Sequence, residues 1–438
     1  MATVTIFLNR LVWGPGLVAL MLGVGLFLTI RTGFAQITLF PAALRRFTDS
    51  FRNPGTGAFR ALCTALAATV GTGNLVGVAG AIALGGPGAI FWMWVCGLIG
   101  MATKFAEATL AIHFREEKNG EYLGGPMYMI RKGLHSRCHW LAGLYAFFGV
   151  FAAFGVGNAT QINAIAASLH LESNLLLGLL LAALVGAVLL GGAKRIGAAA
   201  EFLVPFASII YLLLGAGVLV LRFEAIPDAF TSIVRGAFDP GAVTGGLVGS
   251  FFAAMRTGVS RGVFTNEAGM GTASIAHASA EVAHPAQQGL LGIMEVFIDT
   301  ILICTMTALV ILLSGIPIPY GTDSGGDLTA DAFSAVYGDW VQLLLTACIC
   351  CFAFATVLGW GLYGARCAQY LLGSRACKLF AWIQIIVVII GAVLDTGVIW
   401  SLAETLNGLM AVPNLIALVL LSPTLSCLTK EYKSIMRH

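Results

Sequence analysis

The chain has 438 residues, of which 58% are hydrophobic and only 10% are charged, and its mean hydropathy is +0.90. A soluble domain carries about 25% charged residues, so the composition excludes a soluble globular protein. It predicts an all-α polytopic membrane protein. The formal net charge of +3 gives no reason to expect a nucleic-acid partner.

About eleven apolar segments follow one another along the chain, each long enough to cross a bilayer as a helix. They cover residues 11–30, 61–84, 87–113, 140–168, 173–192, 201–221, 245–275, 287–315, 339–366, 378–398 and 403–425. The first segment lacks a charged start and a small-residue cleavage site, which indicates a retained span rather than a signal peptide. The predicted units are an N-terminal helix with a cytoplasmic interfacial segment (1–60), two five-helix groups (61–222 and 245–425) and a cytoplasmic tail (426–438).

The loops between these spans differ sharply in positive charge. Most of the 24 Lys and Arg residues fall in the loops on one side, and only Arg10, Arg222 and Arg235 fall on the other. Because Lys and Arg accumulate in cytoplasmic loops, this asymmetry predicts a multi-pass protein of the plasma (inner) membrane. Its N-terminus would lie outside and its C-terminus in the cytoplasm.

Two of the predicted spans carry helix breakers and polar residues at mid-depth. Residues 70–79 read VGTGNLVGVA, and residues 261–272 read RGVFTNEAGMGT. Irregular backbone at membrane depth is tolerated only where it is buried in protein or lines a cavity. We therefore predict a broken helix in both spans. The alternative for the first span is that its glycines only allow close helix packing.

The two interrupted spans stand five spans apart, and each opens a group of five. A repeat with an odd number of spans is inserted upside down, so the pattern predicts two five-helix halves of opposite orientation. This is an arrangement of secondary transporters, whose half-helix ends and freed carbonyls bind substrate and cation near the bilayer midplane.

Several blocks of the sequence resemble one transporter family. They are GGPGAIFWMW at 85–94, VGTGNLVGVA at 70–79, FGVGNATQINAIA at 154–166, RGVFTNEAGMGTASIAHA at 261–278 and EVFIDTILICTMTA at 295–308. Together they resemble the alanine or glycine:cation symporters, also called sodium:alanine symporters, over nearly the whole chain. The resemblance implies a leucine-transporter-type fold, a 5+5 inverted repeat with one extra N-terminal helix. Where this family commonly has Gly-Ser-Ala-Pro, the chain has GTAS at 271–274, which leaves the shape after the second break open.

An amino-acid substrate needs N–H donors for its carboxylate, acceptors for its ammonium group and a cavity for its side chain. The candidate substrate-binding residues are Gly71, Thr72, Gly73, Asn74, Gln161, Thr265 and Trp360. The resemblance places residues 339–366 opposite the first break. It implies that Thr356, with the carbonyls of Ala67 and Val70, binds sodium, and that Trp360 limits side-chain size. On the residues alone, a tryptophan at position 360 is more often a packing residue, and only the resemblance makes the two roles equal. The alternative for Gln161 is a link between helices.

Several charged residues in the spans have two interpretations each. Glu295 and Asp299 share a helix face at i,i+4 spacing, either as an ion or proton site or as partners of Arg256 or Arg261. Glu267 either satisfies a helix end or binds the substrate ammonium. Lys104 and Glu107 are expected to pair, or to extend toward the membrane interface.

The sequence therefore predicts a secondary active transporter that imports small neutral amino acids (alanine, glycine), coupled to sodium by alternating access. A proton-coupled or serine-preferring symporter of the same fold is the alternative, and a passive channel competes. The histidines and cysteines show no metal spacing and no nucleophile–base pair, so we expect no enzyme activity and no transition-metal site. The expected partners are a small amino acid, sodium as the coupling ion and the lipid bilayer, with no other cofactor and no obligatory protein partner.

Overall fold

The computed structural model describes residues 12–118, 120–169, 174–248, 250–322, 325–394 and 397–436. Arg10, one of the residues used to predict orientation, lies outside them. The α-helices of the first part are α2 (Pro15–Arg31), α3 (Ala35–Thr38), α4 (Phe40–Arg52), α5 (Gly57–Thr69), α6 (Val78–Gly85), α7 (Gly88–His113), α8 (Pro126–Gly133), α9 (Trp140–Phe154), α10 (Thr160–Leu169), α11 (Asn174–Leu189) and α12 (Gly192–Leu221).

The second part of the chain is also mainly helical. Its helices are α13 (Ile226–Phe238), α14 (Pro240–Thr244), α15 (Phe251–Asn266), α16 (Thr272–His277), α17 (Pro285–Val296), α18 (Thr305–Leu313), α19 (Gly325–Tyr337), α20 (Val341–Leu372), α21 (Ala376–Val393), α22 (Gly397–Leu420) and α23 (Ser422–Ile435). Wider π-helical turns are η1 (Gly73–Gly77), η3 (Gly155–Ala159) and η5 (Phe297–Cys304), and 3₁₀ turns are η2 (Ser136–Cys138) and η4 (Phe223–Ala225). A small antiparallel hairpin pairs β1 (Glu116–Lys118) with β2 (Glu121–Leu123).

The prediction of an all-α polytopic membrane protein is confirmed. By length and composition, 7 helices of the described chain can cross a membrane, and the bent pair α5–α6 makes up to 8. Two further predicted spans are the shorter apolar helices α2 and α11. The remaining predicted span, 245–275, is divided between α15 and α16.

Both predicted helix breaks are present. The first break begins at Val70, directly after α5, where the ψ of 102° is extended. The axes of α5 and α6, the two halves of this span, are bent by 51°. The second break begins at Glu267, directly after α15. Glu267 adopts a left-handed φ of 52°, and Gly269 and Gly271 follow with φ of 96° and 78°. Glycine accepts such angles without steric cost, so the glycine pattern in the sequence and the observed break have the same cause.

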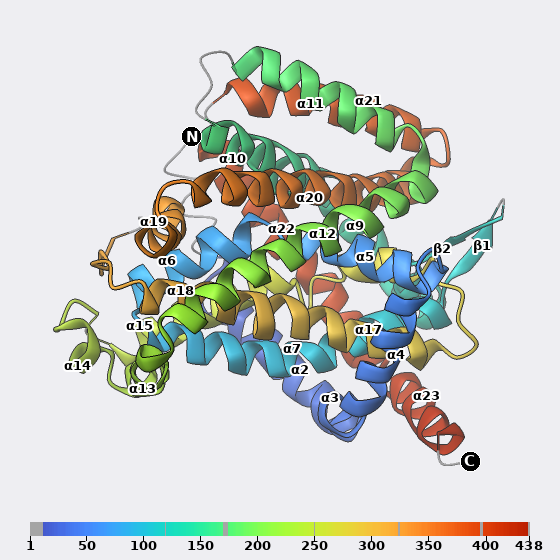
Figure 1. Ribbon diagram of the computed structural model, residues 1–438. Coiled ribbons are helices and arrows are strands. Elements are labelled where there is room, and N and C mark those ends of the chain that lie inside the picture. The colour runs from blue at the N-terminus through green and yellow to red at the C-terminus, as the bar shows by residue number, and fades with distance from the viewer. Residues whose placement is uncertain are drawn as a thin grey trace.

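The two broken helices lie against each other in opposite directions. The first half of one, α5, packs on α16, the second half of the other, while α6 packs on α15. The long helix α7 contacts α15 and α17 extensively and lies in the middle of this group, whereas α11 and α21 pack side by side at one edge (Figure 1). The breaks are therefore enclosed by helices rather than exposed at the edge of the bundle.

Two segments differ from the sequence-based expectation. The segment 315–338, which lies between two predicted spans, contains α19, whose buried Thr329 donates a hydrogen bond of 3.0 Å to the Leu75 carbonyl in η1. At the other end, α22 stops at Leu420 and α23 begins at Ser422, before the expected start of the tail at 426. Pro423 in the first turn of α23 explains this boundary, because proline cannot continue the preceding helix.

Candidate functional site

Asn74 holds the first break together. Its carbonyl oxygen accepts the Gly71 N–H at 2.9 Å, and its amide nitrogen donates to Asp299 Oδ1 at 2.7 Å. The same nitrogen also contacts the Asp299 carbonyl and the Cys304 sulfur in η5. The Asn74 side chain is fully buried. Its position links the bent backbone of one half of the chain to a carboxylate of the other half.

The predicted site residues of α10 and α20 converge on the same break. Thr72 donates to Gln161 Oε1 at 3.2 Å. A Cβ added to Gly71 would lie 2.9 Å from Thr356 Oγ1 and 3.9 Å from Gln161 Oε1. Both side chains therefore border the Gly71 backbone, and only a residue without a side chain fits between them.

Thr356 also contacts the predicted sodium ligands. Its hydroxyl group lies 2.9 Å from the Ala67 carbonyl oxygen and 3.0 Å from the Phe352 carbonyl oxygen. Val70, the residue with extended ψ, directly follows α5, the helix that contains Ala67. The structure thus brings Ala67 and Thr356 together from segments 289 residues apart.

Trp360 lies one helical turn beyond Thr356 and is 1% exposed. It packs closely against η3, because a Cβ added to Gly157 would lie only 2.2 Å from Trp360 Cβ. Its indole ring meets Tyr363 edge-on, with the ring centroids 5.8 Å apart. The indole is therefore fixed in position by the backbone of η3, one turn from Gln161.

Thr265 approaches the first break from α15. Its methyl group would lie 3.6 Å from a Cβ at Gly73, whereas its hydroxyl group donates to the Gly262 carbonyl at 2.9 Å in its own helix. The hydroxyl hydrogen is thus already used within α15. Only the oxygen lone pairs of Thr265 remain for an additional partner.

The second break is closed by protein side chains. Glu107 Oε1 accepts the N–H groups of Gly269 and Gly271, each at 3.0 Å, and the Asn414 amide at 2.7 Å. Asn414 also donates to the Gly269 carbonyl. Both backbone N–H groups already have a carboxylate partner, so the two breaks are not equivalent and the first is the candidate site.

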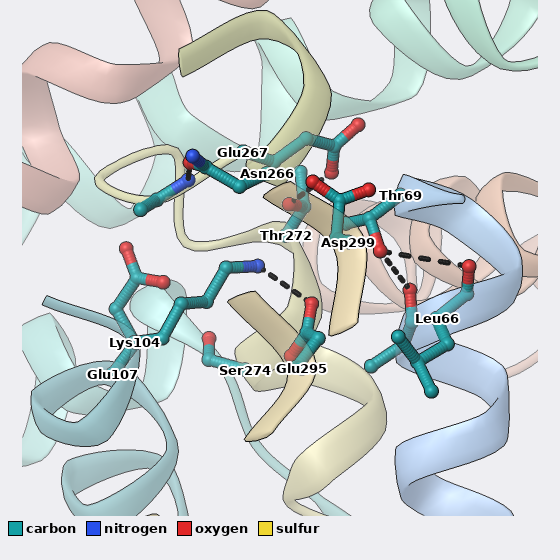
Figure 2. Close-up of polar contacts among 12 residues, drawn as sticks. Leu66, Thr69, Lys104, Glu107, Asn266, Glu267, Thr272, Ser274, Glu295 and Asp299 are labelled. Carbon is teal, nitrogen blue, oxygen red and sulfur yellow. Dashed lines mark hydrogen bonds and ion pairs between the residues drawn. The ribbon is translucent and has the colours of Figure 1, made fainter. Parts of the chain in front are cut away.

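The charged residues of the spans form a network around Lys104. Lys104 Nζ lies 2.9 Å from Glu295 Oε1, and His277 Nε2 lies 2.9 Å from the other oxygen of Glu295. All three side chains are buried. Figure 2 shows Lys104 reaching Glu295 across the space beside the second break, with Asp299 and Thr69 on the side of α5.

The suggestion that Glu295 pairs with Arg256 or Arg261 is wrong, because its partners are Lys104 and His277. Lys104 and Glu107, which were expected to pair or to extend toward the interface, are both buried and have different partners: Lys104 pairs with Glu295, and Glu107 accepts from the second break and Asn414. Glu267 lies at the end of α15 and accepts a hydrogen bond of 2.6 Å from Thr272, which agrees with a helix-end role. Asp299, whose role the sequence left open, is a direct partner of Asn74.

The comparison with known proteins decides the class of this molecule. The sequence profile of the Sodium:alanine symporter family matches residues 1–438. The chain belongs to that family. Its members are transporters rather than enzymes, so this sodium:alanine symporter family protein is an amino-acid symporter with a multi-pass membrane architecture.

Relatives of this family member are named for different substrates and ions. The sodium/alanine symporter AgcS of Methanococcus maripaludis is 45% identical over 98% of this chain and 97% of its own length. The probable sodium/glutamine symporter GlnT of Bacillus subtilis is 37% identical, with 97% and 89% covered. The putative sodium/proton-dependent alanine carrier protein YrbD of Bacillus subtilis is 34% identical, with 99% and 93% covered.

Proposed function

We propose that this chain imports small neutral amino acids, alanine and glycine, together with sodium by alternating access. The observation that carries the proposal is the first break, a bent helix with Asn74, Gln161 and Thr356 around its freed backbone. The relative from Methanococcus maripaludis, named for sodium and alanine, supports the same substrate and ion. A serine-preferring symporter of the same fold is the alternative for the substrate.

We propose a leucine-transporter-type fold with two inverted five-helix repeats and one helix in front of them. The opposite directions of the two broken helices support this, because a repeat of five spans reverses its orientation. We also propose that the N-terminus lies outside. The hairpin β1–β2, α4 and α23 lie at one end of the molecule and α13, α14 and α19 at the other (Figure 1), as expected if the basic segments share the cytoplasmic side.

We propose that substrate and sodium bind side by side at the first break. Substrate would be bound by Gly71, Thr72, Gly73, Asn74, Gln161, Thr265 and Trp360, and sodium by the carbonyls of Ala67 and Val70 with the Thr356 hydroxyl. Thr72 and Gly73 stand at the start of η1, where backbone N–H groups have no partner within a helix. Because Asn74 already receives the Gly71 N–H, we assign the substrate carboxylate to the Thr72 and Gly73 amides, with Asn74 shaping the break.

The central test is uptake of labelled alanine into proteoliposomes under imposed gradients. A sodium gradient should drive accumulation, and a pH gradient without sodium should not, because the groups beside Thr356 are neutral oxygens suited to a cation. Accumulation at full rate with a pH gradient alone would contradict sodium coupling.

The proton-coupled alternative has its own structural support, since the Asp299 carboxylate is bonded directly to Asn74. The variant Asp299→Asn keeps an oxygen for the Asn74 amide and removes the proton-binding group. If sodium is the coupling ion, this variant should retain sodium-driven accumulation. Loss of pH-driven accumulation in this variant alone would instead identify a proton carrier.

Thr356→Val should weaken sodium binding in particular, because valine keeps the shape of threonine and removes one oxygen. We expect the sodium concentration for half-maximal uptake to rise about fivefold, the effect of losing one polar contact of about 1 kcal/mol. Half-saturation by alanine at saturating sodium should change less. Thr429→Val on α23 is the matched control, since Thr429 is also buried and bonded within its helix. A larger effect on alanine than on sodium would reassign Thr356 to the substrate.

Trp360→Leu should widen the range of substrates. Apolar burial alone favours larger side chains by about 0.8 kcal/mol per methylene, so a preference for alanine must come from steric exclusion, which costs about 1–3 kcal/mol. Competition of labelled alanine uptake by valine and leucine should therefore strengthen about fivefold or more, and alanine itself should bind less well. The control is Trp382→Leu, because Trp382 is 56% exposed on α21. If the variant still excludes leucine and binds alanine normally, the indole does not limit the substrate's size.

A further inference from the structure

A cavity of about 410 Å³ lies at the end of the bundle where α2 begins. Its walls come from α6, α15, α22 and the segment just before α2, and include Trp13, Arg256, Ser260, Arg261, Phe264 and Glu404. We call it the arginine vestibule. It contains none of the residues assigned above to substrate or sodium.

The charges of the arginine vestibule are unusual for a membrane protein. Arg256 and Arg261 both line it from α15, and no carboxylate of the described residues lies within 4.0 Å of either guanidinium group. Glu404 lines the same cavity from α22. Charged residues within membrane spans are costly and generally functional. With two guanidinium groups and one carboxylate among its lining residues, the vestibule carries an excess of positive charge.

One aromatic side chain separates the arginine vestibule from the first break. Phe264 lines the cavity, and its ring carbon Cδ1 would lie 3.7 Å from a Cβ added to Gly73. Trp13 packs edge-on against Phe264, with ring centroids 6.5 Å apart. A solute in the vestibule is therefore one ring away from the Gly73 backbone. The next residue of α15, Thr265, is part of the proposed substrate site.

We propose that the arginine vestibule binds the carboxylate of an amino acid before it reaches the first break. Arg256 and Arg261 supply the charge-assisted hydrogen bonds that guanidinium groups form with carboxylates. This proposal rests on the proposed function, because it assigns a first binding step to the same substrate. With the N-terminus outside, the vestibule opens to the external solution and acts on uptake.

The kinetic test uses proteoliposomes containing Arg256→Gln, Arg261→Gln or the corresponding lysine variants. At saturating sodium, each glutamine variant should raise the KM for alanine about tenfold, the effect of losing one charge-assisted hydrogen bond. The maximal rate should stay within about twofold of wild type, because saturating alanine compensates for weaker capture. Lysine keeps the charge and should restore part of the affinity. Arg235→Gln is the control, since Arg235 is exposed on α13 outside the vestibule.

A second measurement does not depend on transport. Purified wild-type protein is treated with phenylglyoxal, an arginine reagent, and modification of each arginine is followed by peptide mass spectrometry. Alanine should slow modification of Arg256 and Arg261 but not of Arg235, and alaninamide, which lacks the carboxylate, should protect none of them. The vestibule proposal is overturned by unchanged KM values in both glutamine variants, or by absence of protection. Wild-type protein that shows protection without sodium-dependent uptake would contradict the proposed function alone.

Discussion

Asn74→Ala is expected to reduce sodium-driven alanine uptake about thirtyfold or more. The substitution removes the side-chain partner of two buried groups, the Gly71 N–H and Asp299 Oδ1. Each orphaned group costs about 1 kcal/mol or more, and about 2 kcal/mol corresponds to a roughly thirtyfold change in the population of the bent arrangement. Initial uptake rates in proteoliposomes, normalised to the amount of inserted protein, measure the effect.

Asn163→Ala is the matched control for this prediction. Asn163 also lies on a helix of the first half, but its only described hydrogen bond is a long contact of 3.5 Å to the Leu394 carbonyl. Its uptake rate should stay within about twofold of wild type, because little hydrogen-bond energy is lost at that distance. Equal rates for Asn74→Ala and wild type would show that the bend does not need the asparagine amide and that its role is packing.

Lys104→Met is expected to cause the largest loss of stability. Lys104 is 1% exposed and its partner Glu295 is fully buried, so the variant leaves the Glu295 carboxylate with His277 as its remaining partner. Removing one partner of a buried ion pair costs about 3–5 kcal/mol. The apparent melting temperature in detergent and the yield of folded protein should both fall.

Two further variants separate charge from packing in this network. Lys104→Met combined with Glu295→Gln removes both charges and keeps an acceptor for His277, so it should recover a large part of the lost stability. Lys132→Met removes a half-exposed partner 3.7 Å from Glu116 and should change stability by about 1 kcal/mol or less. A melting temperature for Lys104→Met equal to that of Lys132→Met would contradict an energetically important buried pair.

The position of both helix breaks could be predicted because their cause is local. Glycine at 269 and 271 accepts positive φ, and a polar group such as Asn74 in an apolar run needs a buried partner. These requirements belong to the residues themselves and are visible without any neighbour. The all-helical membrane architecture follows in the same way, from hydropathy and the length of the apolar runs.

The partners of the charged residues could not be predicted. Lys104 and Glu295 are 191 residues apart, and Asn74 and Asp299 are 225 residues apart. Arg256 and Arg261 were the nearer basic residues in the sequence, yet they line a separate cavity. The i,i+4 spacing of Glu295 and Asp299 placed both on one helix face without showing which helix that face meets.

The sequence by itself determined the class of this protein: a polytopic membrane protein with two broken spans and the motifs of the sodium:alanine symporters. Only the tertiary structure decided how the two breaks differ. Glu107 accepts hydrogen bonds from the backbone N–H groups of the second break. At the first break, Asn74 holds the bent backbone that precedes the N–H groups at the start of η1. Hydropathy, glycine angles and helix breaks depend on each residue and its chain neighbours. The choice of partner for a buried charge depends on which helices pack together, because a carboxylate satisfies whichever donors the packed helices bring within about 3 Å of it.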